Sequence, residues 1–258
     1  MPRLRLAVVP FALLMSVGCF EGQRTFKVNA DGSGAIVDTT KLGAQAQGML
    51  QGLEGMEQGT AAEKKAKKTA KLAEKAKAMG EGVTFISSEP RADGLEVTTY
   101  AFKDITKVRV SAMPAPNEGA SSKDEPMAFK LARNAAGNMV LTINSPKGKS
   151  SEGAVEPPAT KSPEETARQI GMMKAMMAGL KVRSVVEVNG SLVKASGAQA
   201  AGSMVTLMEL DFDALDAAAL QKLAEAESDG PPTPAMLKGI KGIKVSDPEV
   251  TIEFKAVK

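Results

Sequence analysis

Short runs in which apolar and polar residues alternate recur along most of this chain, separated by glycine-containing turns. The run QRTFKVN at 23–29 is followed by the sequence DGSG at 31–34 and by a second run at 35–40. Asp-Gly between two strand-like runs is a strong hairpin signal, because glycine accepts the positive φ that the turn needs. Similar runs predict three strands over 83–112, of which the first two flank a second Asp-Gly turn at 93–94 and the third covers 105–112. They also predict a hairpin over 127–144 and strands over 202–211, 243–245 and 249–256.

Asn189-Gly190 gives the clearest hairpin prediction in the chain. It stands between two strand-like runs, 181–188 and 191–196. Asn-Gly favours the type I′ turn, whose twist matches that of the two strands it joins. We therefore expect these two runs to pair with each other.

Two stretches have helical periodicity instead. The range 43–80 predicts a long N-terminal helical segment, although glycines in its first half each cost ~1 kcal/mol relative to alanine. The range 162–180 predicts a Met-rich helix, with Ser162 as N-cap and Glu165 at capping-box spacing. Shorter helices are expected at 214–227 and 234–240. The predicted fold class is α+β, with a mostly antiparallel β-sheet built from hairpins and packed with the long N-terminal helical segment and the Met-rich helix.

Composition divides the chain into four parts. Residues 1–18 are the predicted signal peptide, and 19–145 form an N-terminal α+β region. Residues 146–162 are polar and rich in proline and glycine, which predicts a flexible linker or loop. Residues 163–258 form a C-terminal α+β region, which can share one sheet with the N-terminal region.

The first nineteen residues have the pattern of an export signal. Arg3 and Arg5 precede the uncharged, mostly apolar run LAVVPFALLMSV at 6–17, and Gly18 stands before Cys19. A charged start, a short apolar middle and a small-residue end are typical of a secretory signal. A membrane-spanning helix needs ~20 apolar residues, so the run is too short for a comfortable permanent anchor.

Ser16-Val17-Gly18-Cys19 resembles the lipobox of bacterial lipoproteins. In that family the signal is cut before the cysteine, whose thiol carries a diacylglycerol, and the resemblance implies that Cys19 is the acylated first residue. The family usually has leucine where this chain has Ser16. Small residues here also suit ordinary signal-peptidase cleavage, which would leave a lone free thiol in an oxidising compartment, an unusual arrangement. Phe20 rather than aspartate follows the cysteine, and in an organism with two membranes the resemblance implies the outer membrane rather than retention in the inner one.

Two further motifs resemble uncharacterised bacterial lipoproteins. VNADGSG at 28–34 is similar to an early hairpin of such proteins, and AFKDI at 101–105 is similar to a later strand end. The resemblance covers roughly 19–145. It implies an envelope α+β fold and brings no known activity with it.

The composition excludes several classes of function. The chain has no histidine, which removes Ser-His and Cys-His nucleophile pairs and His-ligated zinc. Cys19 is the only cysteine, so the body has no thiolate metal ligand. Removal of residues 1–18 takes away Arg3 and Arg5 and no acidic residue, so the formal net charge falls from +3 to +1. A near-neutral body argues against nucleic acid as the main partner.

Two side-chain clusters have alternative interpretations. The range 61–79 contains seven lysines and only two glutamates. These lysines can face anionic headgroups or a cell-wall polymer, or they can form a solvated helix face opposite a stripe of alanines that packs against the protein. We favour the solvated face, because alanine buries too little area to drive insertion into a membrane. The methionines of the Met-rich helix can bind Cu(I) or fill an irregular core, and we favour the core. The four methionines are Met172, Met173, Met176 and Met177.

Together these observations predict a lipid-anchored envelope lipoprotein with a non-enzymatic binding or scaffolding role. Its partners are the membrane, through acyl chains on Cys19, and an envelope protein or the cell wall, but not nucleic acid. The alternative is a periplasmic carrier of an apolar ligand or lipid, and a carboxylate- or lysine-dependent enzyme is the third possibility. Cys19 is the only predicted site residue, and no catalytic residue, metal ligand or cofactor is predicted.

Overall fold

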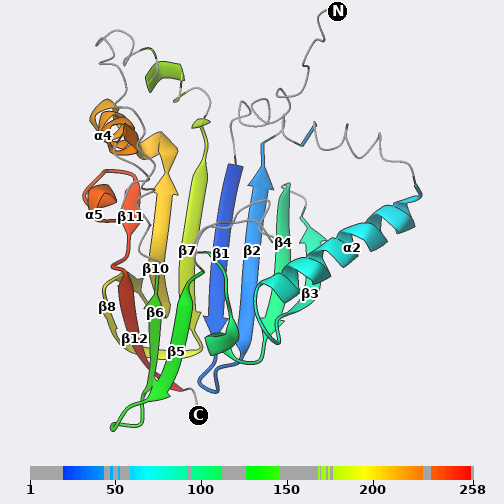
Figure 1. Cartoon of the computed structure of the whole chain (residues 1–258), viewed down its shortest axis with the longest axis vertical. Coiled ribbons are helices and arrows are strands. Elements are labelled where there is room, and N and C mark those ends of the chain that lie inside the picture. Colours follow the sequence, from blue (N-terminus) through cyan, green and yellow to red (C-terminus); the bar gives the residue numbers. More distant parts are fainter. Residues whose placement is uncertain are drawn as a thin grey trace, which may run out of the picture.

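The chain folds mainly into two β-sheets (Figure 1). The computed structural model describes residues 20–43, 47–48, 52, 59–91, 94–111, 126–145, 168, 170–172, 174, 177–228 and 234–256. The predicted signal peptide and the predicted linker at 146–162 lie outside these residues. Strands from before and after 146–162 contribute to both sheets.

The larger sheet has eight strands in the order β11-β10-β7-β1-β2-β4-β3, with β9 paired to β10. The parallel pair β1 and β7 lies at its centre, and all other neighbours are antiparallel. The strands are β1 (Phe20–Val28), β2 (Gly34–Leu42), β3 (Thr84–Pro90), β4 (Leu95–Phe102), β7 (Lys181–Val188), β9 (Gln199–Ala201), β10 (Met204–Asp211) and β11 (Ile243–Val245).

The smaller sheet has four antiparallel strands in the order β5-β6-β12-β8. It packs against one face of the large sheet, which we call the inner face. Apolar side chains alternate on both sheets and meet between them, and the rings of Phe26 and Phe129 are 5.4 Å apart. The strands are β5 (Ala128–Arg133), β6 (Met139–Asn144), β8 (Gly190–Ser196) and β12 (Glu249–Ala256).

The predicted α+β class is wrong, because the structure is mostly β. The described residues form three short helices, α2 (Ala61–Ala78), α4 (Ala217–Ser228) and α5 (Pro234–Leu237), and two 3₁₀ turns, η2 (Ile105–Lys107) and η3 (Phe212–Ala214). A second sheet, rather than a layer of helices, covers the apolar part of the inner face. No long N-terminal helical segment is present among the described residues, since α2 accounts only for the later part of 43–80. The predicted Met-rich helix falls mostly outside the described residues.

Helix α2 packs apolar side chains against the core with its C-terminal half only. Ala76 is buried and Leu72 packs against the main core, whereas Ala62, Ala66 and Ala70 are exposed. The interpretation of the alanines as a continuous packing stripe is therefore wrong. Figure 1 shows the N-terminal half of the helix projecting beyond β3, at the edge of the large sheet.

Three predicted hairpins are confirmed, namely β1–β2, β3–β4 and β5–β6. The predicted third strand at 105–112 is wrong for its described part. Asp104 caps η2 through its side chain, which accepts a hydrogen bond from the backbone of Thr106. Val108 then forms a single bridge to Gly80.

The predicted hairpin at Asn189-Gly190 is also wrong. β7 belongs to the large sheet and β8 to the small one, so the chain changes sheets at Asn189. The backbone N–H of Asn189 donates to the carbonyl of Val28, and its side-chain amide donates to Asn29, at 2.8 and 3.0 Å. A Cβ at Gly190 would lie 2.1 Å from the carbonyl oxygen of Lys255. The glycine therefore permits a close approach of β8 to β12.

Candidate functional site

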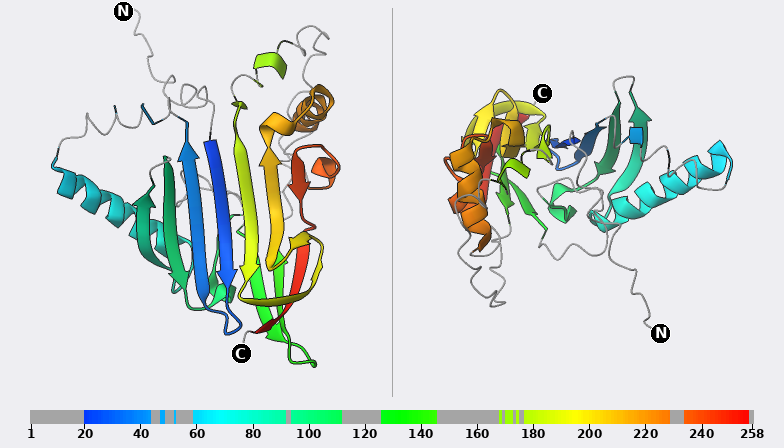
Figure 2. Two further views of the ribbon diagram at one scale, coloured as in Figure 1. Left: turned by 180° about the vertical axis from the view of Figure 1, so that it is seen from behind. Right: turned by 90° about the horizontal axis from the view of Figure 1, so that it is seen from above.

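The outer face of the large sheet carries a polar groove at the end where β1 begins. Figure 2 (left) views this face, with α2 and most of the small sheet on the far side. The groove has a volume of about 480 Å³ and crosses five strands. Its lining residues are Glu21, Gly22, Gln23, Thr39, Leu95, Lys181, Val182, Arg183, Glu209, Leu210 and Asp211.

Oppositely charged side chains face each other across β7 and β10 along one wall of the groove. Lys181 and Asp211 are register partners, with Nζ and Oδ2 3.4 Å apart. Arg183 and Glu209 are also register partners, with Nε and Oε2 3.4 Å apart. Lys244 on β11 adds a 2.6 Å contact to the other carboxylate oxygen of Glu209. The groove thus offers both signs of charge within a few residues.

Two atoms of this wall are buried and form no hydrogen bond within the described part of the chain. They are Nε of Arg183 and Oδ1 of Asp211. The Arg183 Nε atom is close enough to Glu209 for an ion pair but lacks hydrogen-bond geometry. Buried polar atoms are normally bonded, so these two are exceptions to that rule at the wall of the groove.

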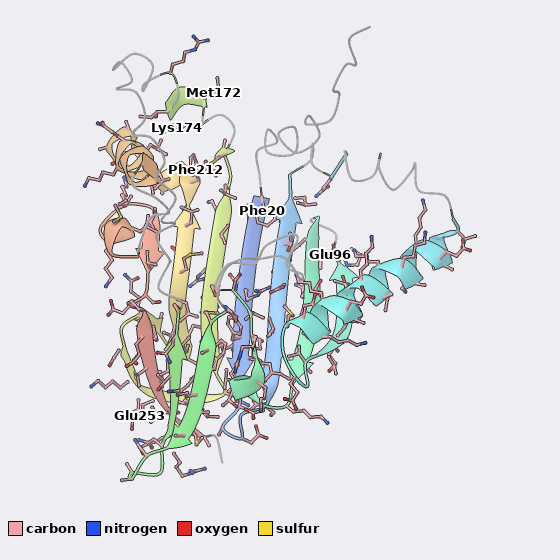
Figure 3. All side chains as sticks on the ribbon, in the orientation of Figure 1. Phe20, Glu96, Met172, Lys174, Phe212 and Glu253 are labelled. Atoms are coloured by element: carbon pink, nitrogen blue, oxygen red, sulfur yellow. The ribbon has the colours of Figure 1, made fainter. Side chains whose placement is uncertain are left out.

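The predicted lipidation residue, Cys19, lies outside the described residues. The residue after it, Phe20, is the first residue of β1 and lies at the upper end of that strand in Figure 3. Glu21, one residue further, lines the groove. The groove and the predicted lipid attachment point are therefore close neighbours in the chain.

Sequence reasoning missed the groove because its charges come from strands far apart in the chain. A signal was nevertheless present. The triplet KVR at 181–183 and the triplet ELD at 209–211 have the same spacing and opposite charge. Such triplets match residue for residue on antiparallel strands, but only a known pairing of β7 with β10 identifies them as partners.

The described methionines of the predicted Met-rich helix do not form one cluster. The side chain of Met172 is 57% exposed and lies near the top of the molecule in Figure 3. Met177 packs against a second, smaller apolar cluster that includes Phe212, Leu215 and Leu220. Met173 and Met176 lie outside the described side chains.

No group of three His, Cys, Asp or Glu side chains in the described part of the chain is close enough to hold a metal ion. No helix there has both the length and the apolar character that crossing a bilayer requires.

No protein-family model matches the chain, and no curated protein matches it. Among solved structures, the NMR structure of the folded domain of LppM from Mycobacterium tuberculosis, a lipoprotein domain, has a TM-score of 0.32 at 9% sequence identity. The alignment covers 100% of this chain and 97% of that chain. A likeness this weak transfers neither a fold nor a role to the present chain.

Proposed function

We propose that this chain is an exported lipoprotein, anchored by acyl chains on Cys19, that binds another envelope protein through the groove without catalysing a reaction. The observation that carries the proposal is the adjacency of the lipobox-like sequence and the groove. Only one residue separates Cys19 from Glu21, and each extended residue spans at most ~3.6 Å. Acyl chains on Cys19 would therefore hold the groove at the membrane surface.

The chemistry of the groove supports a polar partner with both signs of charge. Lys181 and Asp211 present an ammonium and a carboxylate side by side, and the outward-facing Gln23 and Thr39 add groups that donate and accept hydrogen bonds. Complementary charges at such a surface give specificity and a faster encounter more than raw affinity. A protein surface offers this mixed pattern, whereas a uniformly anionic polymer matches only half of it.

The carrier alternative receives less support. An apolar ligand needs an apolar cavity, and the interior between the sheets is occupied by the chain's own side chains. Phe26, Leu141, Ile143, Ile252 and Phe254 are all fully buried there. Native mass spectrometry after gentle extraction would support the carrier if a lipid remained bound.

The anchor is tested by metabolic labelling with radioactive palmitate, followed by fractionation. We expect the label in the wild-type chain and not in Cys19→Ser, which should leave the membrane fraction. Separation of inner and outer membranes on a density gradient then tests the outer-membrane location, which Phe20 supports by resemblance. An unlabelled wild-type chain, or unchanged fractionation of Cys19→Ser, contradicts the anchor.

The groove is tested by cross-linking in intact cells from a photoreactive residue at position 23. We expect one cross-linked protein, identified by mass spectrometry, whose yield falls at least fivefold when Lys181 and Asp211 are both changed to alanine. The matched control changes Lys27 and Glu187, an ion pair of the same type on the same face at the other end of β7. The proposal is contradicted if the cross-linking yield falls equally in both double variants, or if the cross-link forms to cell-wall material.

A further inference from the structure

The N-terminal half of α2 is rich in lysine, and its alanines are all exposed. Between Ala61 and Lys71 every residue is exposed except Lys64, which is half-buried. This stretch contains five lysines and one acidic residue, Glu63. Helices of globular proteins normally bury one face. Packing therefore does not explain why the N-terminal half of α2 carries so many lysines.

Specific contacts hold this half of the helix in place. Thr60 and Glu63 form a capping box at its start. Further along, Nζ of Lys68 is 2.6 Å from a carboxylate oxygen of Glu96 on β4, and the hydroxyl of Ser88 on β3 donates to the same oxygen. The helix is thus fixed to the sheet at Lys68, while Lys65, Lys67 and Lys71 remain exposed.

The exposed half of α2 lies toward the end of the molecule at which β1 begins. In Figure 1 the helix rises from the middle of the sheet, and its N-terminal end reaches about the level of the upper ends of β1 and β4. Figure 3 places Phe20 at that upper end, with Glu96 lower down, beside α2. The N-terminal end of α2 and Phe20, the residue after Cys19, therefore lie toward the same end of the molecule.

We propose that Lys67 and Lys71, one turn apart on the same face of α2 and hereafter called the lysine surface, dock onto the anionic phospholipid headgroups of the bilayer that holds the acyl chains. This inference rests on the proposed lipid anchor and adds a second, electrostatic attachment to it. A lysine near an anionic membrane surface strengthens binding by about fivefold, and the effect is screened by salt. The exposed alanines between the lysines are too small to drive insertion, so the helix rests on the headgroups.

The second attachment would set the orientation of the protein. A single flexible anchor leaves the body free to turn about the attachment point. Contact at α2, at the β3 edge of the large sheet, would fix the inclination of the sheet to the bilayer and the direction in which the groove opens. Acyl chains and a basic segment together are also a more durable attachment than either alone.

The test uses the acylated full chain, reconstituted with vesicles of pure phosphatidylcholine or of phosphatidylcholine with one quarter phosphatidylglycerol. Lysines are acetylated with a short pulse of an amine reagent and quantified by mass spectrometry. We expect at least threefold protection of the lysine surface on the anionic vesicles only, and its loss in 0.5 M NaCl. Lys130 on β5 and Lys194 on β8, both exposed, serve as internal controls that should not change.

A charge-reversed variant gives an independent readout. Changing both lysines of the lysine surface to glutamate should accelerate transfer to acceptor vesicles at least tenfold from anionic vesicles and leave transfer from phosphatidylcholine unchanged. The control variant reverses Lys130 and Lys194 instead.

The two proposals fail in different ways. A chain that does not float with phosphatidylcholine vesicles contradicts the lipid anchor. If the chain floats with both vesicle types but its lysine surface is acetylated equally on both, the docking of α2 is contradicted and the lipid anchor is not. The same holds if a soluble polyanion added instead of anionic vesicles protects the lysine surface and the vesicles do not.

Discussion

Arg24 and Asp38 lie opposite each other on β1 and β2, and the guanidinium donates two hydrogen bonds of 2.7 Å to the carboxylate on the inner face. Arg24 is fully buried, and it also donates to the backbone carbonyl of Ser111 at 3.2 Å. Lys75 of α2 adds a second cation 3.7 Å from Asp38. The pair therefore links the large sheet both to the helix and to the chain that follows η2.

Arg24→Met should be strongly destabilising. Removing one partner of a buried ion pair leaves the other charge without adequate compensation, at a typical cost of about 3–5 kcal/mol. Urea denaturation of the wild-type and variant chains measures the difference in the free energy of unfolding. The double variant Arg24→Met with Asp38→Leu removes both charges and should recover most of the loss. A single variant within ~1 kcal/mol of wild type contradicts this account.

Gly34→Ala should also be destabilising, because a close approach requires glycine at this position. A Cβ on Gly34 would lie 1.9 Å from the carbonyl oxygen of Lys27 and 2.6 Å from the ring of Phe102. Overpacking against groups that cannot move typically costs about 1–3 kcal/mol, which thermal or urea unfolding would detect. Gly52→Ala is the control, since nothing lies within 4 Å of a Cβ there, and no destabilisation is expected. Equal stability of both variants contradicts the steric argument.

The extent to which sequence predicted this fold depends on how local each contact is. The β1–β2 and β5–β6 hairpins were predictable because their turn residues and alternating runs are adjacent in the chain. The partner of β7 was not, because Asn189-Gly190 carries a strong local turn signal while its contacts, with Val28, Asn29 and Lys255, are distant. The parallel β1–β7 pair and the groove depend on the same kind of distant pairing.

The prediction of a continuous packing stripe on α2 failed for a different reason. Lysine, alanine and glutamate give α2 a high intrinsic propensity, which predicts its existence and its end near Ala78. Propensity does not say what a helix packs against, and the alanine spacing falsely suggested a buried stripe. Arg24 shows the same limit, because a charged residue in an alternating run gives no indication of burial when its partner Asp38 is fourteen residues away.

Glu96→Gln should remove a stabilising contribution that depends on pH. Burial alone raises the pKa of Glu96, but hydrogen bonds from Lys68 and Ser88 and the charge of Lys68 outweigh it, so the pKa lies below its ordinary value of 4.5. Ionised Glu96 therefore stabilises the fold above the unfolded-state pKa, and this contribution is lost as the pH falls through the lower folded-state pKa. The side chain is 37% exposed, so screening limits the effect to under ~1 kcal/mol.

Unfolding free energies of the wild type and Glu96→Gln, measured at intervals from pH 7 to pH 3, test this expectation. The wild type should have the higher free energy of unfolding at neutral pH, and the difference between the two chains should approach zero toward pH 3. Glu89→Gln is the control, since Glu89 is an exposed acid on the neighbouring edge strand β3. A difference that grows on acidification would have the wrong sign for this account.

Thr60→Ala should loosen the start of α2 while leaving the rest of the fold intact. The Thr60 hydroxyl accepts from the Glu63 backbone at 3.2 Å, and the Glu63 carboxylate accepts from the Thr60 backbone at 2.6 Å. The hydrogen bonds that the Glu63 carboxylate accepts from the Thr60 backbone and from the Thr60 hydroxyl lower the pKa of Glu63. Loss of such a cap costs about 1 kcal/mol, and here the cost falls on a helix half that contacts the sheet through the Lys68–Glu96 ion pair.

Hydrogen exchange separates this local effect from global unfolding. Amides of the N-terminal half of α2 should exchange about fivefold faster in Thr60→Ala, while those of β1 and β7 keep their protection. Thr69→Ala changes the same residue type at an exposed position within the helix, where alanine is the better helix former, and should exchange no faster than wild type. If Thr60→Ala leaves exchange in this half of α2 unchanged, the capping box does not hold this half in place. The lysine surface would then lack the preorganised position on which its docking depends.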